Sequence, residues 1–331
     1  MRQLLAVVAA LLMVGAALIA RSAIDDDNGN NGNGGDGSTP TLLCAAELGD
    51  VCDELARSED IDVFKAPMDA VASDSDMLRE YDGWLTFERN AERVSEARVR
   101  SSLDRITEEP SDPIARSPVV IAIAEERADV LATQCGGDVT WQCIGDVAGE
   151  PWQSIGGSIT WGEVKPAHAD PESTGEGLVI IGEQAAHFFG TTDLSRDNFD
   201  EDEFLEWFTR LERSTKTDSN AFQALLTSRS ATYDVVATLE ARADESLAQR
   251  EDVRLIYPAP VATADVVFIQ VVDGDDDLAD IVTGDAGQDA LRDAGFRVDD
   301  DERNPPLSDG SRLPSAGVLE ALLQTWREVT G

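Results

Sequence analysis

The chain has 331 residues, enough for two compact units of ordinary size. Its 65 aspartates and glutamates outnumber its 26 lysines and arginines, so the formal net charge is −39. This balance argues against nucleic-acid partners and against binding to anionic lipid surfaces, because both need clustered lysine and arginine. A surface this acidic is typical of a secreted protein that stays soluble by self-repulsion, and we expect it to suit high salt.

The N-terminal segment, residues 1–24, contains an unbroken apolar run from Leu4 to Ala20 that lies between two arginines. This pattern predicts a secretory signal peptide. As a helix the run would span about 25 Å, close to the thickness of a bilayer core, so an uncleaved membrane anchor is the alternative. Residues 25–41 are rich in Asp, Asn and Gly and are predicted to form a disordered linker. Either way, we expect the body of the protein outside the cell or in the cell envelope.

Four cysteines form two close pairs in the sequence. Cys44 and Cys52 are eight residues apart, and so are Cys135 and Cys143. In an exported chain this spacing predicts two local disulfides, although four cysteines allow three connectivities. A zinc site is the alternative, but the pairs lack C-x-x-C spacing.

The periodicity of apolar residues predicts elements along the whole chain after the linker. Strands are predicted at residues 41–46, 61–64, 118–124, 158–164, 253–257 and 264–272, with a strand or turn beginning at 84–87. Helices are predicted at residues 47–58, 68–81, 90–106, 125–133, 178–189, 201–213, 220–227, 232–241, 281–294 and 317–329. Strands alternate with helices, which predicts an α/β fold with mostly parallel sheets flanked by helices.

The strand at 118–124 is continuously apolar, as expected of a central strand covered on both faces. The long excursion between this strand and those at 253–272 would let the chain build a second lobe and return. We therefore predict two lobes joined by two crossings, with a cleft between them. Residues 42–117 and 256–331 would form lobe 1, and residues 118–255 would form lobe 2.

The loop before the helix at 178–189 combines hydroxyl groups with a glycine. Ser173, Thr174 and Gly175 stand where a helix N-cap belongs, and an apolar run follows them. Free N–H groups and the positive end of the helix dipole would then point at one spot, which suits an anion. We expect these three residues to donate to a ligand, with an ordinary capped helix as the alternative. Three earlier residues could touch the ligand but are expected to hold the loop in place: Lys165, His168 and Asp170.

This loop also carries a family resemblance. The pattern Trp161-Gly162-x-Val164-Lys165-Pro166-x-His168-x-Asp170-Pro171, followed by hydroxyls and Gly177-Leu178, resembles the second-lobe loop of bacterial extracellular solute-binding proteins. It is most similar to actinobacterial solute-binding-like domains that are often fused to von Willebrand A modules. The segments Asp82-Gly83-Trp84-Leu85 and Tyr233-Asp234-Val235-Val236 resemble further parts of those domains.

The resemblance implies the type 2 periplasmic-binding-protein fold, which closes around a ligand by hinge bending. It places the ligand outside the carboxyl ends of the strands. The expected lobe 1 wall and the crossing supply five more ligand-binding residues: Ala45, Ala46, Trp84, Thr86 and Tyr257. Family members with oxyanion ligands have a serine in the turn after the first strand, whereas this chain has Cys44-Ala45-Ala46. No Asp-x-Ser-x-Ser motif is present, so we expect no von Willebrand A module.

Catalytic and metal-binding patterns are missing from the sequence. There are only two histidines, and neither a nucleophile elbow nor a His-Glu-x-x-His motif occurs. The acidic runs lack the ligand spacing of a calcium loop, and Gly32–Gly37 lies in the linker. We therefore expect no catalytic residue, no metal and no cofactor. A secreted hydrolase would have no assembled nucleophile and base.

The sequence thus predicts an extracytoplasmic solute-binding protein rather than an enzyme. It would capture a small solute, an anion being one option, between two hinged lobes for uptake or sensing. We expect a monomer that works with an ABC-type membrane permease or an envelope protein. The alternative is a membrane-tethered interaction module of the cell envelope with the same fold and a vestigial cleft.

Overall fold

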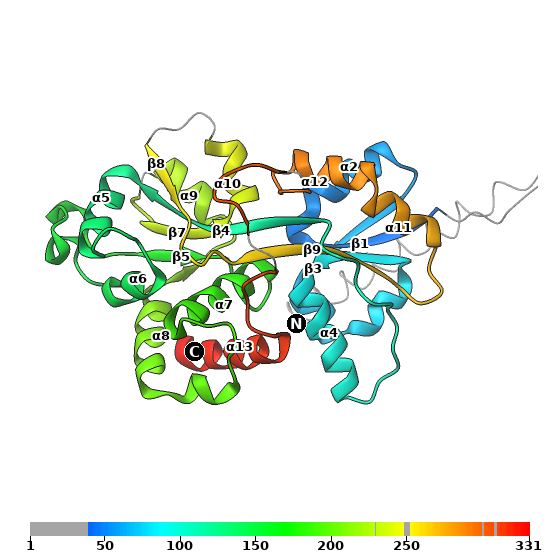
Figure 1. Ribbon diagram of the computed structural model, residues 1–331, viewed down its shortest axis with the longest axis horizontal. Helices are drawn as coiled ribbons and strands as arrows, with labels where there is room; N and C mark the ends of the chain where they lie inside the picture. Colours follow the sequence, from blue (N-terminus) through cyan, green and yellow to red (C-terminus); the bar gives the residue numbers. More distant parts are fainter. Residues whose placement is uncertain (1–38, 229, 248–251, 300, 308–309) are drawn as a thin grey trace, which may run out of the picture. The chain divides into compact units, whose positions relative to one another are not determined.

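The computed structural model in Figure 1 describes residues 39–228, 230–247, 252–299, 301–307 and 310–331. Residues 39–331 pack as one unit. The predicted signal peptide or anchor and residues 25–38 of the predicted linker lie outside the described residues. Within the described part of the chain, no helix is both long and apolar enough to cross a membrane.

The first lobe is built on a sheet with strand order β2-β1-β3-β9. Strand β1 (Thr41–Ala45) pairs in parallel with β2 (Asp62–Ala66) and β3 (Gly83–Phe87), and β3 pairs antiparallel with β9 (Thr263–Gln270). The apolar residues of β1 and β3 are buried in the interior of the lobe. The helical elements of this lobe are η2 (Ala46–Leu48), α2 (Gly49–Ser58), α3 (Met68–Ser73), η3 (Ser75–Glu80), α4 (Glu88–Arg100), α11 (Asp276–Thr283) and α12 (Asp285–Asp293).

The second lobe is built on β4 (Ala115–Ala124), β7 (Val235–Leu239), β5 (Pro166–His168) and β6 (Lys216–Thr217). Strand β5 is parallel to both β7 and β6, whereas β4 is antiparallel to β7 and to β8 (Val253–Ile256). The helical elements of this lobe are α5 (Glu125–Gln134), α6 (Trp141–Val147), η4 (Trp152–Ile155), η5 (Ile159–Trp161), α7 (Gly175–Phe189), η6 (Arg196–Asp200), α8 (Asp202–Ser214), α9 (Ala221–Ser228) and α10 (Glu240–Leu247).

Strands β4 and β9 carry the chain between the two lobes, and Figure 1 shows them side by side. The first residues of β4, Ala115–Pro118, pair with β9, and the residues from Val119 onward pair with β7. Residues Val119 to Ile123 are fully buried, as the continuous apolar run predicts. The expected strand at the centre of the fold is therefore confirmed, and it belongs to both sheets.

The C-terminal helix α13 (Ala316–Thr330) contacts elements of both lobes. It packs on α7 and α8 of the second lobe and on α4 of the first. Arg93 of α4 donates two hydrogen bonds, of 3.0 and 2.7 Å, to the carboxylate of Glu320 in α13. The predicted residue ranges of the two lobes stay a prediction.

Two predicted elements differ from the structure. Residues 158–164 were expected to form a strand, but a short 3-10 turn, η5, takes their place, and Ile159 is 72% exposed. The apparent alternation came from side chains on an exposed turn that ends at Gly162, where φ is +74°. Residues 232–241 were expected to be helical, but they contain the buried strand β7. Its β-branched Val235, Val236 and Thr238 favour a strand covered on both faces.

The predicted helix at residues 281–294 is interrupted. Helix α11 ends at Thr283 and α12 begins at Asp285, with Gly284 between them in an extended conformation. A side chain on Gly287 would clash with the carbonyl oxygen of Val282. The close approach of the two helices therefore requires a glycine at this position.

Both predicted disulfides are confirmed. Cys44 is bonded to Cys52, and Cys135 is bonded to Cys143. The first bond ties the end of β1 to α2 in the first lobe, and the second ties the end of α5 to α6 in the second. Each bond closes a short local loop and limits the conformations of the unfolded chain.

We expect the Cys44→Ala/Cys52→Ala variant to lose about 2.5 kcal/mol of unfolding free energy through loop entropy, plus a packing loss, because both residues are fully buried. Urea denaturation followed by circular dichroism would measure this loss. The Cys135–Cys143 bond closes a loop of the same length, so the matched Cys135→Ala/Cys143→Ala variant should show the same entropic loss. An unchanged denaturation midpoint in both variants would contradict the argument.

Candidate functional site

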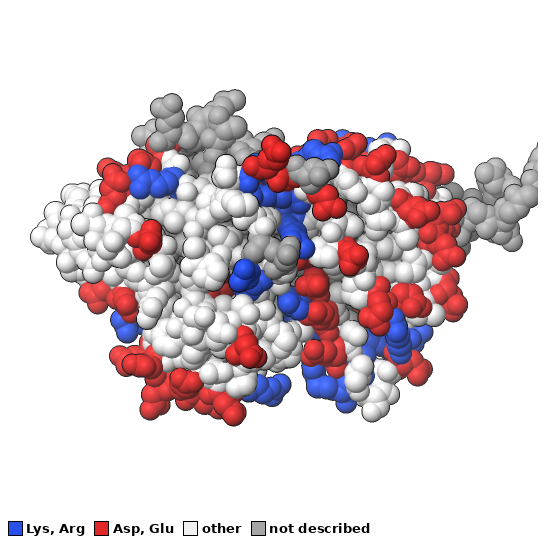
Figure 2. Space-filling model, viewed as in Figure 1, with Lys and Arg blue, Asp and Glu red and all other residues white. Residues whose placement is uncertain are grey.

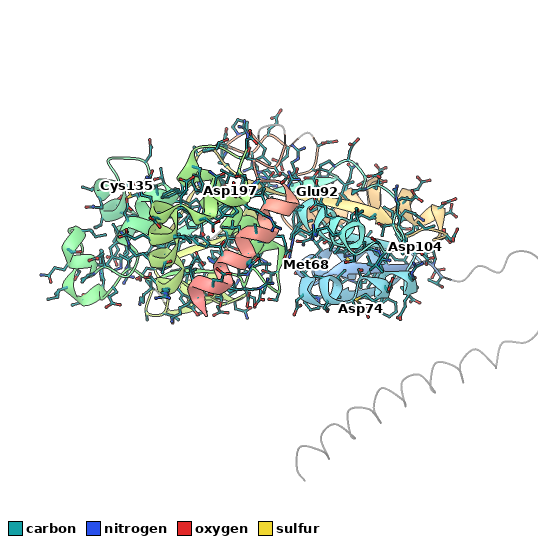
Figure 3. All side chains as sticks on the ribbon, turned by 90° about the horizontal axis from the view of Figure 1, so that it is seen from below. Met68, Asp74, Glu92, Asp104, Cys135 and Asp197 are labelled. Atoms are coloured by element: carbon teal, nitrogen blue, oxygen red, sulfur yellow. A yellow bond between two sulfur atoms is a disulfide. The ribbon has the colours of Figure 1, made fainter. Side chains whose placement is uncertain are left out.

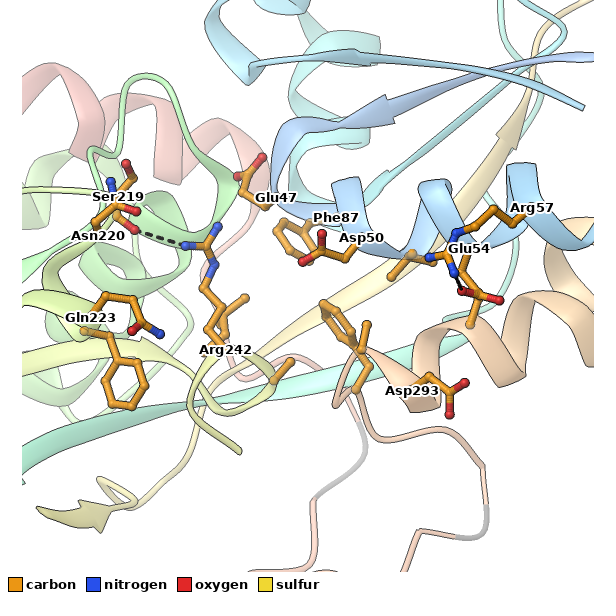
Figure 4. A pocket seen from close by; sticks show the side chains of 17 residues that line it. Glu47, Asp50, Glu54, Arg57, Phe87, Ser219, Asn220, Gln223, Arg242 and Asp293 are labelled. Carbon is orange, nitrogen blue, oxygen red and sulfur yellow. Dashed lines mark hydrogen bonds and ion pairs between the residues drawn. The ribbon is translucent and has the colours of Figure 1, made fainter. Parts of the chain in front are cut away.

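The carboxyl ends of the parallel strands in both lobes meet at one place. Glu47 follows β1, Phe87 ends β3, Ser219 follows β6, and Arg242 follows β7. These residues line a cavity of about 460 Å³ between the lobes, which Figure 4 shows from close by. Helices α2 and α12 form its wall in the first lobe, and α9 and α10 form its wall in the second. This is the position that open α/β sheets favour for ligands.

The lining of this cavity carries an excess of negative charge. Four carboxylates and two guanidinium groups belong to it: Glu47, Asp50, Glu54, Asp293, Arg57 and Arg242. Arg57 is paired with Glu54, and Arg242 is paired with Glu176 at 3.1 Å. Among the described residues, neither Asp50 nor Asp293 forms an ion pair. The face of the molecule in Figure 2 is also rich in acidic side chains over the lobe that contains α2 and α12.

Helix α7 begins at the interface between the lobes. Thr174 is its N-cap, as predicted: the Thr174 hydroxyl accepts a hydrogen bond from the Gly177 N–H at 3.0 Å and donates one to the Asp170 carbonyl at 2.6 Å. Side chains at Gly175 and Gly177 would clash with their surroundings, so both positions suit only glycine. The hydroxyl of Thr174 is therefore engaged within the loop.

The first N–H group of α7 donates to a carboxylate of the opposite lobe. Gly175 N–H bonds to Oε1 of Glu47, which lies in η2 just after β1. Burial raises the pKa of Glu47, and backbone hydrogen bonds, including the one from Gly175, oppose that shift. The second carboxyl oxygen, Oε2, is buried and has no hydrogen-bond partner among the described residues. The predicted anion position at α7 is thus filled by the chain itself.

A second hydrogen bond joins the lobes beside the first. The Met68 N–H, at the start of α3, donates to the Ser173 carbonyl at 3.1 Å. Figure 3 labels Met68 on the side of its lobe that faces α13. Two backbone donors, one from each lobe, therefore hold the loop at Ser173–Gly175 against the first lobe.

The predicted ligand-binding residues lie in several places. Ala45 is buried and Ala46 is exposed, while Trp84 and Thr86 are buried within the first lobe. The Tyr257 hydroxyl donates to the Glu240 carboxylate at 2.7 Å. Ser173 lines a different cavity, beside α3 and α4. Their contacts with a ligand stay predictions, as do those of Thr174 and Gly175.

The three residues predicted to support the loop make contacts suited to that role. Lys165 donates to the Ala231 carbonyl at 2.9 Å through its ammonium group, and to Asp234 at 3.0 Å through its backbone. The Asp170 carboxylate accepts from the Glu172 N–H at 2.8 Å. His168 is buried under the loop.

His168 belongs to a buried polar cluster. Its Nε2 lies 3.1 Å from the Glu212 carboxylate, which also accepts from the Trp326 indole at 2.8 Å. Its Nδ1 lies 2.7 Å from the Ala169 carbonyl, so both ring nitrogens face acceptors. Burial alone would lower the pKa of His168, but the charge and hydrogen bond of Glu212 raise the pKa above its ordinary value. We infer a charged imidazolium that ties β5 to α8 and α13.

Glu47 and Arg242 were not predicted as site residues, because no local sequence pattern identifies them. Glu47 is one of 65 acidic residues and is the first residue of the helix predicted at 47–58. Arg242 comes directly after the segment 232–241, which was predicted to be helical. That segment contains strand β7, and the turn from β7 into α10 places Arg242 at the cavity. A correct assignment of β7 would have put Arg242 at a carboxyl strand end. In the described parts of the chain, no group of three or more His, Cys, Asp or Glu side chains could hold a metal ion.

Solved structures with the same fold are two-lobed binding proteins. The chain is similar to the periplasmic binding protein AfuA from Actinobacillus pleuropneumoniae, solved with fructose-6-phosphate, at 13% identity and a TM-score of 0.60, with 88% of this chain and 98% of that chain covered. It is similar to iron-bound HitA from Pseudomonas aeruginosa at 12% identity and a TM-score of 0.61, with 88% and 99% covered.

An ABC transporter structure from Clostridium perfringens has 10% identity and a TM-score of 0.53, with 88% of this chain and 100% of that chain covered. No protein-family model matches the sequence, and no curated protein matches it. The chain therefore has the two-lobed periplasmic-binding-protein fold.

We expect His168→Gln to lower the unfolding free energy by about 3 to 5 kcal/mol near pH 6, because the buried Glu212 would lose its charged partner and keep only the hydrogen bond from Trp326. Since the folded-state pKa is raised above 6.5, this stabilisation is complete below pH 6.5 and is lost as the pH rises through the raised value. Urea denaturation of wild type and variant between pH 5.5 and 9 would measure the difference.

His187 provides the matched control for this measurement. It is the other histidine, it bonds to the Pro260 carbonyl at 3.0 Å, and burial lowers its pKa. His187→Gln should therefore show no stabilising contribution that fades with rising pH. The same pH profile for both variants would contradict the assigned charge on His168.

Proposed function

We propose that the protein is an extracytoplasmic solute-binding protein that encloses a small solute between its two lobes for uptake or sensing. The observation that carries this proposal is the cavity lined by both lobes at the carboxyl ends of their strands. Its volume of about 460 Å³ falls within the range of small-molecule sites. Hinge bending at the β4 and β9 crossings would open and close it.

The solute that suits this cavity best carries a positive charge. Asp50 and Asp293 face it without an ion pair in the described structure, whereas Arg57 and Arg242 are already paired. The α7 donor that an anion would use is engaged by Glu47. The proteins of similar fold bind unlike ligands, fructose-6-phosphate in AfuA and iron in HitA. The charge of the solute is therefore set by the side chains that line the cavity and not by the fold.

We further propose that the protein acts as a monomer with an ABC-type permease or an envelope protein. Its acidic surface, its two disulfides and its predicted export segment favour an extracellular or envelope location. The ABC transporter structure from Clostridium perfringens, which has a similar fold at 10% identity, supports the proposal of a permease partner.

An interaction module with a vestigial cleft is the second candidate. Two hydrogen bonds between the lobes, Gly175 to Glu47 and Met68 to Ser173, favour it, because they close the lobes without a solute. Such a module would present a fixed surface to an envelope partner. Its cavity would accept no solute.

A thermal-shift screen of the full chain against amines, cationic amino acids, sugars and oxyanions separates these candidates. We expect a cationic hit, and we expect Asp50→Asn/Asp293→Asn to weaken its binding about tenfold through lost Coulomb attraction. Calorimetry would measure both affinities. Asp280→Asn is the control, since Asp280 is an exposed aspartate of α11 away from the cavity.

If no solute of the panel raises the melting temperature of the wild type, the interaction module is favoured. An oxyanion hit whose affinity is insensitive to Asp50→Asn/Asp293→Asn would contradict a cationic solute. Equal weakening by Asp280→Asn would show that only the overall charge matters.

A further inference from the structure

The amino-terminal end of α7 is occupied by a carboxylate that belongs to the opposite lobe. Gly175 is the first residue of α7, so its N–H has no partner within the helix. That N–H donates to Glu47, and the positive end of the helix dipole faces the same carboxylate. Glu47 comes from η2 of the first lobe, 128 residues away in sequence. An acidic side chain thus occupies the position that a free anion would take.

An unpartnered polar side chain lies beside the start of α7. Asn90 is 1% exposed, and both its amide nitrogen and its amide oxygen lack partners among the described residues. Its amide nitrogen lies so close to Gly175 that a side chain there would clash with it. Oε2 of Glu47 is also unpartnered. A buried amide donor, that of Asn90, therefore lies beside the start of α7 and is not used by Glu47.

The next residue of α7 adds a negative charge beside this position. The Glu176 carboxylate accepts from the Thr238 hydroxyl at 2.7 Å and the Leu239 N–H at 3.2 Å, and it is paired with Arg242. The hydrogen bonds and the ion pair of this carboxylate stay within the second lobe, whereas its charge raises the pKa of Glu47. Glu47 therefore provides the contact from the first lobe, and no partner within α7 competes for the Gly175 donor.

We propose that Glu47 determines the specificity of the cleft by acting as a tethered carboxyl group that takes the place of a free anion. In the closed protein it fills the α7 position and excludes anionic solutes, which leaves the cavity to solutes that do not need the Gly175 donor. The inference rests on the proposed function in taking the space between the lobes as the solute site. Removing the carboxylate should turn the same position into a site for a small oxyanion.

Competition between the tether and a free anion sets the size of the effect. A carboxylate held on the same chain acts at an effective concentration on the order of millimolar or more. A free anion must exceed that concentration to displace it from the wild type. Without the carboxylate, we expect phosphate to bind at least tenfold more tightly than it binds the wild-type protein.

The experiment titrates inorganic phosphate into the full chain by calorimetry at pH 7 and constant ionic strength, with chloride as the balancing ion. Glu47→Ala should bind phosphate at least tenfold more tightly than wild type, and its melting temperature should rise with phosphate concentration. Glu47→Gln should gain less, because its amide oxygen can still accept from Gly175. Glu203→Ala is the control, since Glu203 is an exposed glutamate of α8 that does not line the cavity, and its removal changes the net charge by the same amount.

The proposal is overturned if neither Glu47 variant binds phosphate more tightly than wild type, or if Glu203→Ala gains as much as Glu47→Ala. Circular dichroism checks folding, and Glu47→Gln, which keeps the side-chain size, decides the outcome if Glu47→Ala does not fold. A three-fold gain by Glu47→Gln then supports the proposal, and no gain overturns it.

This result is independent of the natural solute. A wild-type protein that binds none of the screened solutes would contradict the proposed function, yet the gain in phosphate binding would still be measured in the variants. A wild type that binds a cation, with phosphate binding unchanged in both variants, would overturn only the role of Glu47.

Discussion

Antiparallel pairing between β4 and β9 is the constraint on which the rest of the structure depends. The first residues of β4 pair with β9, and its later residues complete the second sheet, so one strand belongs to both lobes. The lobes are thereby joined through two strands while the carboxyl ends of β1 and β3 face those of β5, β6 and β7 across the cavity. Glu47, Phe87, Ser219 and Arg242 each follow or end one of these strands.

The contacts between the lobes share a common chemistry. Helix α7 and the loop before it contribute backbone groups, and the first lobe contributes their partners. The Gly175 N–H donates to the Glu47 carboxylate, and the Ser173 carbonyl accepts from the Met68 N–H. Buried groups of this kind are costly when unpaired, so each contact favours the closed arrangement only while its partner is present. The excess carboxylates of the cavity lining and the occupied α7 terminus both work against an anionic solute, for the same electrostatic reason.

Sequence patterns predicted the framework better than the site. The apolar run of β4, the Thr174 cap and the short cysteine pairs depend on local chemistry, and all three are as expected. Strand β7 was mistaken for a helix because a short run of buried residues has no clear period. Glu47 could not be identified, because its partner lies 128 residues away and only the folded chain brings them together. A pairing between residues so far apart cannot be predicted from the local sequence pattern around either of them.

The Gly175 amide proton reports most directly on the central claim that Glu47 occupies the end of α7. As the first N–H of a helix it would exchange quickly with solvent if it had no acceptor. Amide hydrogen exchange followed by NMR should show protection of Gly175 in the wild type and its loss in Glu47→Ala, with the Gly177 amide, which bonds to Thr174, protected in both. Fast exchange of Gly175 in the wild type, or equal protection in both proteins, would contradict the account.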